Sequence, residues 1–297
     1  MKLYTTIAEL LNDYISYNGW KKVDLARHLG VDYKNVQRWL SDSNRLSSEF
    51  EHLLVEKLNL PFQVIHNLNA DYSIPVSYNI RTRRFSISEV SKSPIDREFL
   101  ASQKDDIKIY KAEPITSEAD IKAILDYDHS IYDTSVPLPS ILIEQSSQLL
   151  PELNLIVKDT LGYYCGHLIT IPIKQAPYQK LRSDLLSEGD LRIEDLSRPN
   201  ESVTMSFHFY SVYGTCTDTS TLLLKKALRY FNSHKFNPEC ILSGYAVTAD
   251  GIEIAQKLGF NTVFENHKEF EEYNTERIPT FFEQKIGVLD LLKLHNK

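Results

Sequence analysis

Two separate groups of polar side chains in this chain of 297 residues could do chemistry. The first lies between residues 33 and 38, where amide and basic side chains follow one another. Asn and Gln can pair bidentately with adenine, and Arg and Lys with guanine. This group consists of Tyr33, Lys34, Asn35, Gln37 and Arg38. The alternative is that these side chains only solvate a surface helix.

The second group consists of residues that can exchange protons. The segment 203–210 alternates apolar and polar residues, which predicts a strand with one buried face. His208 and Tyr210 share one face of that strand, and Tyr245 lies in a later predicted strand. Histidine and tyrosine act as general acids or bases when suitably placed, so these three are the catalytic candidates. On a strand, the commoner role of such side chains is packing or exposure to solvent.

Short amphipathic helices must position the first group. Apolar residues at helical spacing predict helices over 6–18, 21–29, 33–40 and 48–58. Thr6 and Asp32 are expected N-caps, and Gly30 supplies the left-handed conformation that turns the chain sharply into the third helix. Trp39 falls on the apolar face of that helix and is expected in the core. Together these helices predict a compact all-α bundle.

The segment from Leu25 to Trp39 resembles the helix-turn-helix of lambda-repressor-like (XRE-type) domains. The pattern Leu25-Ala26-x2-Leu29-Gly30-Val31-x4-Val36-x2-Trp39 carries the resemblance, which covers about residues 5 to 62. In such domains the second helix of the pair enters the major groove and presents its N-terminal residues to base edges. The resemblance therefore implies double-stranded DNA as a partner. It also implies the contact residues: Tyr33, Lys34, Asn35, Gln37 and Arg38 for the bases, and Lys22, Asn44 and Arg45 for the phosphates. Because residues 1–92 have a net charge of only +2, we expect a homodimer to supply the phosphate contacts that a monomer lacks. The apolar C-terminal segment 276–297 could form the dimer contact or pack in the core.

Strands and helices alternate in the second half of the chain, which predicts an α/β (α+β) domain with a mixed central sheet. Polar residues 175–200 are interpreted as an insertion. We predict strands over 107–113, 153–158, 163–173, 203–210, 241–247 and 261–264, and helices over 117–132, 219–231 and 250–258.

This order of elements, with the segment Gly251–Asn261, resembles the GNAT family of N-acyltransferases over about residues 107 to 266. The resemblance implies an acyl-coenzyme A, acetyl-CoA or another, whose pyrophosphate is held by backbone amides at a helix N-terminus. The cofactor candidates are Val212, Gly214, Thr219 and Ser220. The chain departs from the family pattern in three ways. The loop 214–221 has a single glycine, Asp218 adds negative charge there, and Ala255 stands where the family often has a tyrosine general acid. These departures predict weak or no transfer to generic amines.

Composition excludes several classes of protein. The 42% hydrophobic and 25% charged residues are ordinary for a globular protein, and no apolar run is long enough to span a membrane. The amphipathic N-terminus lacks the features of a secretory signal, so we expect a cytoplasmic protein. The three cysteines lie far apart with no zinc-binding spacing, and they are interpreted as reduced, buried thiols with no metal.

We therefore predict a multidomain chain with a helix-turn-helix domain over 1–68, a linker over 69–104 and a GNAT-like domain over 105–297. The predicted function is a bacterial-type transcriptional regulator whose second domain senses a small molecule or mediates assembly. The alternatives are an active N-acyltransferase tethered to the helix-turn-helix domain, and a purely structural scaffold for a partner protein.

Overall fold

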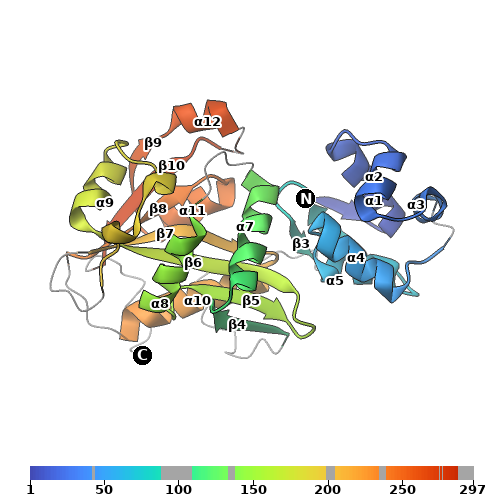
Figure 1. The fold of residues 1–297 in the computed structure, drawn as a ribbon, viewed down its shortest axis with the longest axis horizontal. Helices are drawn as coiled ribbons and strands as arrows, with labels where there is room; N and C mark the ends of the chain where they lie inside the picture. Colours follow the sequence, from blue (N-terminus) through green and yellow to red (C-terminus); the bar gives the residue numbers. More distant parts are fainter. Residues whose placement is uncertain are drawn as a thin grey trace. The chain divides into compact units, whose positions relative to one another are not determined.

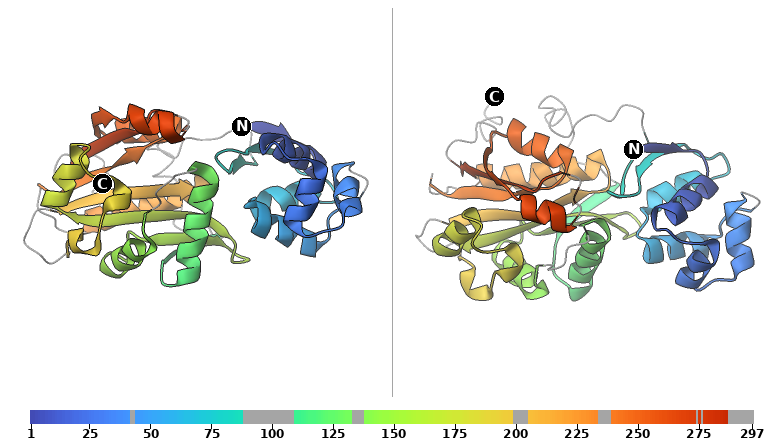
Figure 2. Two further views of the ribbon diagram at one scale, coloured as in Figure 1. Left: turned by 45° about the horizontal axis from the view of Figure 1, so that its top comes forward. Right: turned by 90° about the horizontal axis from the view of Figure 1, so that it is seen from above.

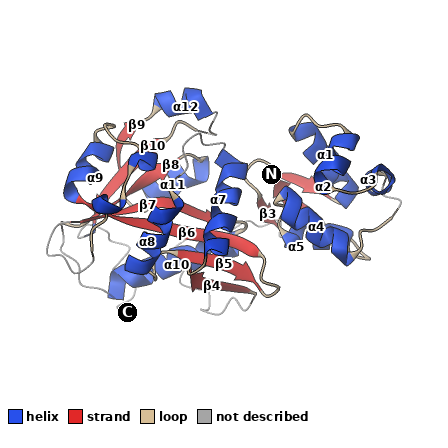
Figure 3. Ribbon diagram, viewed as in Figure 1, coloured by secondary structure: helices blue, strands red, loops and turns tan. Residues whose placement is uncertain are grey.

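The computed structural model describes residues 1–41, 44–87, 109–132, 138–198, 205–233, 239–273, 275 and 277–286 (Figure 1). Contacts within the chain define two compact units. The first comprises Met1–Ser93 with Thr215–Thr217, and the second comprises Pro94–Gly214 with Asp218–Lys297. Both units contain helices and strands (Figure 3).

Five helices build most of the first unit: α1 (Ile7–Tyr17), α2 (Lys22–Leu29), α3 (Tyr33–Leu40), α4 (Ser48–Leu58) and α5 (Phe62–Asn69). Thr6 caps α1 by accepting from the Glu9 N–H, and Asp32 caps α3 by accepting from the Lys34 N–H. Gly30 ends α2 in the left-handed conformation, with φ of 70°. The predicted caps and this turn are confirmed.

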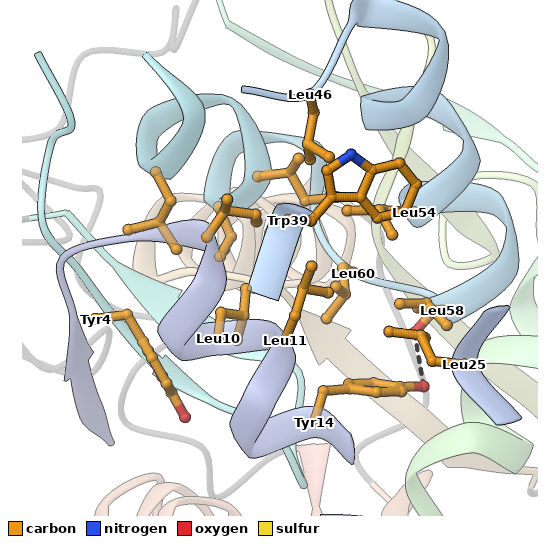
Figure 4. Packing of buried hydrophobic residues seen from close by; sticks show 14 of the residues in the cluster. Tyr4, Leu10, Leu11, Tyr14, Leu25, Trp39, Leu46, Leu54, Leu58 and Leu60 are labelled. Atoms are coloured by element: carbon orange, nitrogen blue, oxygen red, sulfur yellow. Dashed lines mark hydrogen bonds between the residues drawn. The ribbon is translucent and has the colours of Figure 1, made fainter. Parts of the chain in front are cut away.

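Large apolar side chains from these helices meet in one core, part of which is drawn in Figure 4. Trp39 is buried there, as predicted. The Tyr14 hydroxyl lies 3.4 Å from the Leu58 carbonyl oxygen to which it donates (Figure 4). A fully buried side chain of this size contributes about 1.5–3 kcal/mol relative to an exposed one, so the core rather than helix propensity holds the unit together.

The prediction of an all-α first unit is wrong, because the unit also contains an antiparallel sheet in the order β1-β2-β3. Its strands are β1 (Lys2–Tyr4), β2 (Val76–Asn79) and β3 (Arg84–Ser86). The hairpin β2–β3 comes from the stretch that was expected to be linker. Val76, Tyr78 and Phe85 are buried in the helical core, which explains why this polar-looking segment is ordered. Arg83, at the hairpin turn, is buried with its guanidinium carbon 5.2 Å from the Tyr14 ring centroid.

The second unit is built on a seven-stranded sheet in the order β4-β5-β6-β7-β8-β10-β9. All neighbouring strands are antiparallel except β7 and β8, which are parallel. The strands are β4 (Tyr110–Pro114), β5 (Leu155–Asp159), β6 (Tyr164–Lys174), β7 (Met205–Gly214), β8 (Ile241–Ala246), β9 (Asn261–Glu265) and β10 (Thr280–Lys285). The predicted α/β unit with a mixed central sheet is confirmed.

Helices cover both faces of this sheet (Figure 2, right). Leu155, Val157 and Leu168 pack with α10 on one face, and Ile156, Ile169 and Ile171 pack with α7, α8 and α9 on the other. The alternation of neighbouring residues between two apolar cores explains why β5 and β6 read as continuous apolar runs. The helices are α7 (Glu118–Tyr132), α8 (Ser140–Leu149), α9 (Gln175–Arg182), α10 (Thr217–Ser233), α11 (Ala249–Lys257) and α12 (His267–Tyr273), with short 3-10 turns η1 (Glu188–Asp190) and η2 (Ile193–Asp195).

Candidate active site in the second unit

Strand β7 carries the predicted proton-transfer residues and changes its pairing near its middle. Against β6 its register shifts between Phe209 and Ser211, so Tyr210 is the extra residue of a β-bulge. Its parallel pairing with β8 covers Ser206–Phe209 and ends at Gly244. A Cβ at Gly244 would lie 2.6 Å from the Phe209 carbonyl oxygen, so only glycine allows this close approach. Both strands continue beyond the last pair.

His208 is fully buried, with both ring nitrogens hydrogen-bonded. Nδ1 lies 3.0 Å from the Ser243 Oγ, and Nε2 lies 2.6 Å from Oε1 of Glu188 in η1. The ring stacks on Phe281 with centroids 5.9 Å apart. Because these contacts surround the imidazole, His208 can orient Glu188 and exchange a proton with it but does not itself reach solvent. The Glu188 side chain is 22% exposed and is the accessible member of the pair.

The two tyrosine candidates lie near this pair. Burial raises the pKa of Tyr245 far above its usual value, and the charges of Glu188, Glu269 and Asp184 raise it further. Tyr245 therefore keeps its proton and can donate a hydrogen bond, but it is a poor proton source. The Tyr210 hydroxyl accepts a long hydrogen bond of 3.4 Å from the Leu138 N–H.

A second polar cluster, which the sequence analysis missed, lies beside the bulge. His167 on β6 is fully buried between Tyr164 and Ser211: Nδ1 lies 2.5 Å from the Tyr164 hydroxyl, and Nε2 lies 2.7 Å from the Ser211 Oγ. Asp128 on α7 lies 3.5 Å from Nε2 and interacts with Ser211. Burial lowers the pKa of His167 to about 3, and burial raises that of Asp128 to about 8. Near neutral pH the cluster is therefore mostly uncharged.

Glu188 connects the two clusters electrostatically. Its charge raises the pKa of Asp128 and of Tyr245, while its carboxylate holds His208. Glu188 lies in the polar stretch 175–200 that was interpreted as an insertion. No spacing in that stretch marks it, because only the tertiary structure brings η1 to the bulge of β7.

The cofactor candidates lie where β7 passes into α10. A Cβ at Gly214 would lie 2.5 Å from the Ser220 Oγ and 2.7 Å from the Thr219 Oγ1, so glycine lets the first helical turn fold back on the strand. Thr219 is fully buried, Ser220 is half-buried and Val212 is exposed. The helix predicted over 219–231 begins earlier, at Thr217, so Asp218 lies within the first turn of α10. Burial raises its pKa.

The predicted end of α11 is confirmed. Gly259 follows the helix with φ of 81°, and Phe260 packs against the core on the α10 face. Ala255 is half-buried on α11 and supplies no proton donor. No group of metal-binding side chains occurs in the part of the chain that the structure describes, and no helix among those residues is long and apolar enough to cross a membrane.

In the first unit, the predicted DNA contacts lie mainly on the outer face of α3 and beside it. Tyr33, Lys34, Gln37 and Arg38 are exposed and Asn35 is half-buried. The remaining three, Lys22, Asn44 and Arg45, are exposed as well, and Arg45 forms an ion pair with Asp71. Of the C-terminal segment proposed for a dimer contact, residues 287–297 lie outside the described residues.

Comparison with known proteins gives structural similarity only. No protein-family model and no curated protein matches the chain. Among solved structures, one match is Arabidopsis thaliana Naa50 in complex with the bisubstrate analogue CoA-Ac-MVNAL. It is 10% identical to this chain, with a TM-score of 0.41, and the match covers 59% of this chain and 98% of that chain. A histone acetyltransferase HPA2-related protein from Corynebacterium glutamicum is 14% identical, with a TM-score of 0.33 and coverage of 60% and 96%. Arylalkylamine N-acetyltransferase 2 from Aedes aegypti is 12% identical, with a TM-score of 0.36 and coverage of 60% and 99%.

These findings correct the predicted function. The structures named above are acetyltransferases, which favours the acyltransferase alternative, so the prediction of a DNA-binding transcriptional regulator is wrong. Neither the XRE-type identification nor a homodimer receives support from them. Because similarity at this level assigns no role to any residue, we base the proposal below on the chain's own residues.

Proposed function

We propose that the second unit is an N-acyltransferase that uses an acyl-coenzyme A, acetyl-CoA being the simplest. One observation carries the proposal: the only parallel strand pair among the described residues, β7 and β8, stops pairing at Phe209 and Gly244 while β7 runs on through Gly214 into α10. Strand backbone beyond that point can pair with an extended ligand, as in β-augmentation, and a pantetheine arm carries amides suited to this.

The residues at the start of α10 fit the phosphate end of such a ligand. The N-terminus of this 17-residue helix attracts anions through its N–H groups and dipole. Gly214 keeps the strand and the helical turn close together, and Ser220 adds a hydroxyl. Asp218 opposes an anion there, and the helix N–H groups and dipole must outweigh that repulsion. Bound there, the thioester would supply an activated acyl group.

Glu188 is the proposed general base. An amine attacks a thioester only as the free base and must lose a proton as the new bond forms. The Glu188 carboxylate is partly exposed, and the 2.6 Å contact with His208 fixes its orientation. Tyr245, which stays protonated, is the proposed hydrogen-bond donor in the same neighbourhood.

The experiment is thiol release from acetyl-CoA by the full chain in the presence of a panel of amines, with calorimetric titration of acetyl-CoA alongside. Glu188→Gln is expected to lower kcat by about 10²- to 10⁴-fold, the usual contribution of general acid–base catalysis, with binding of acetyl-CoA unchanged. Glu194→Gln, in the neighbouring turn η2, is the matched control because its side chain is 71% exposed. It should behave like the native chain. If the native chain neither binds acetyl-CoA nor releases thiol, the proposed function is wrong.

A further inference from the structure

A continuous row of hydrogen-bonding side chains runs from α7 across β7 and β6. Asp128 interacts with the Ser211 hydroxyl, Ser211 contacts His167, and His167 contacts Tyr164. The Ser211 Oγ lies 2.7 Å from the His167 Nε2, and the His167 Nδ1 lies 2.5 Å from the Tyr164 hydroxyl oxygen. Asp128 and His167 are buried, whereas Tyr164 is half-buried, so the row leads from the interior towards the surface.

Asp128 is the unusual member of the row. Its side chain is 9% exposed, and its Oδ1 has no hydrogen-bond partner. The 3.5 Å from Oδ1 to the His167 Nε2 is too long for a hydrogen bond, and a neutral imidazole makes no ion pair. The titratable and charged groups that face this row are His167 and Tyr164 from β6, Tyr213 from β7, Tyr127 from α7, and Glu188 from η1.

We propose that Asp128, Ser211, His167 and Tyr164 form a proton relay that releases one proton outward when Glu188 takes one from the acceptor amine. The proposal rests on the proposed acyl transfer. Its physical reason is charge: the buried carboxyl of Asp128 and the partly exposed carboxylate of Glu188 cannot both ionise without a cost, and Glu188 already raises the proton affinity of Asp128. When Glu188 is neutralised, that influence disappears, so the pKa of Asp128 falls and its proton is released more easily, although burial, the larger cause, still raises that pKa.

The proton balance of the relay is closed. The amine nitrogen bonds to the acyl carbon, the carbon–sulfur bond breaks, and the coenzyme leaves as a thiolate. The amine proton goes to Glu188. Asp128 passes its own proton to the Ser211 oxygen, and Ser211 passes its hydroxyl proton to Nε2 of His167. His167 then passes its Nδ1 proton to the Tyr164 oxygen, and Tyr164 releases its hydroxyl proton to water. Glu188 and Asp128 together keep one negative charge throughout.

Steady-state acyl transfer by the full chain tests the relay through its pH profile. The acceptor is an arylamine, which has no ammonium group that titrates in the range used. In the native chain Asp128 must be protonated at the start, so kcat should fall as the pH rises through about 8. Asp128→Asn and Ser211→Ala should both lower kcat at pH 7 by about tenfold, the factor that corresponds to one pKa unit of coupling, and both should lose this fall. KM for acetyl-CoA should not change.

Thr170→Val is the matched control, because it removes a buried β6 hydroxyl that has no hydrogen-bond partner and lies outside the row. It should keep the native profile. A Ser211→Ala variant with the native rate and profile overturns the relay while the proposed function stands. A native chain with no thiol release and no binding of acetyl-CoA overturns both. Circular dichroism of each variant establishes that a lowered rate does not come from unfolding.

Discussion

Replacing Asp128 by asparagine should change how the stability of the second unit depends on pH. Burial raises the pKa of Asp128 from 3.8 to about 8, so between these values the folded protein holds a proton that the unfolded chain has lost. Asp128 therefore favours the folded state below pH 3.8, and this contribution is lost as the pH rises to about 8. His167 acts in the opposite direction, because its pKa falls from 6.5 to about 3 and its contribution is lost on acidification.

Between about pH 3.8 and 6.5 the two residues change the stability by equal and opposite amounts as the pH rises, so their effects on its pH dependence cancel. Between pH 6.5 and 8 only Asp128 differs in protonation between the folded and unfolded states. One pKa unit corresponds to 1.36 kcal/mol, so the native chain should lose about 2 kcal/mol of stability relative to Asp128→Asn over that interval. At pH 6.5 the variant can be the less stable protein, because its amide replaces a hydrogen-bonded acid. The prediction concerns the change with pH and not the absolute difference.

The assay uses the buried free thiols Cys165 and Cys240, which lie in the second unit. Their labelling as a function of urea, at pH 6.5 and at pH 8, gives the free energy of opening for each protein. Comparing the two proteins at the same pH cancels the pH dependence of the labelling chemistry. Tryptophan fluorescence is unsuitable, since Trp20 and Trp39 both lie in the first unit. A stability difference that stays constant between the two pH values would refute the assignment of the buried proton to Asp128.

Two further substitutions test packing. Gly214→Ala places a methyl group 2.5 Å from the Ser220 Oγ, so it should lower the free energy of unfolding by about 1–3 kcal/mol. It should also weaken acetyl-CoA binding at least about tenfold in calorimetry. The control Gly251→Ala, whose Cβ would lie 3.1 Å from its nearest atom, should bind acetyl-CoA normally. Arg83→Met should destabilise the first unit by about 2 kcal/mol in urea unfolding followed by tryptophan fluorescence, because it removes a buried cation from the Tyr14 ring. The exposed Arg27→Met should cost less than about 1 kcal/mol, and equal losses for the two arginines would contradict this explanation.

Local patterns were sufficient for most helices and strands. The helices of the first unit follow from apolar residues at helical spacing, and the turn at Gly30 from the freedom of glycine at positive φ. The strand β7 follows from the alternation around Phe207 and His208. In contrast, Arg83 lies in the segment 69–104 that was expected to be a linker, yet it is buried, because its aromatic neighbour Tyr14 lies almost seventy positions earlier in the chain.

The candidate site could be predicted only in part. His208, Tyr210 and Tyr245 were found because they sit in recognisable strands, but their main partner, Glu188, lies in a polar stretch without periodicity. His167 and Asp128 were missed for a related reason. Each reads as an ordinary polar residue in its own strand or helix, and only their common burial at the bulge of β7 shifts their pKa values in opposite directions.

The sequence by itself determined the type and order of the helices α1 to α4 and the strands β4 to β9, because periodicity, caps and glycines act within a few residues of each other. Only the tertiary structure decided how distant elements pair. The last strand, β10, inserts between β8 and β9, and the segment that forms it had been considered for a dimer contact or core packing. Its apolar residues, such as Phe281 and Phe282, suit either outcome equally well by composition. Pairing with β8 and the contact with His208 select core packing for β10, since strand pairing satisfies the backbone hydrogen bonds while Phe281 fills the core on the face of α7, α8 and α9.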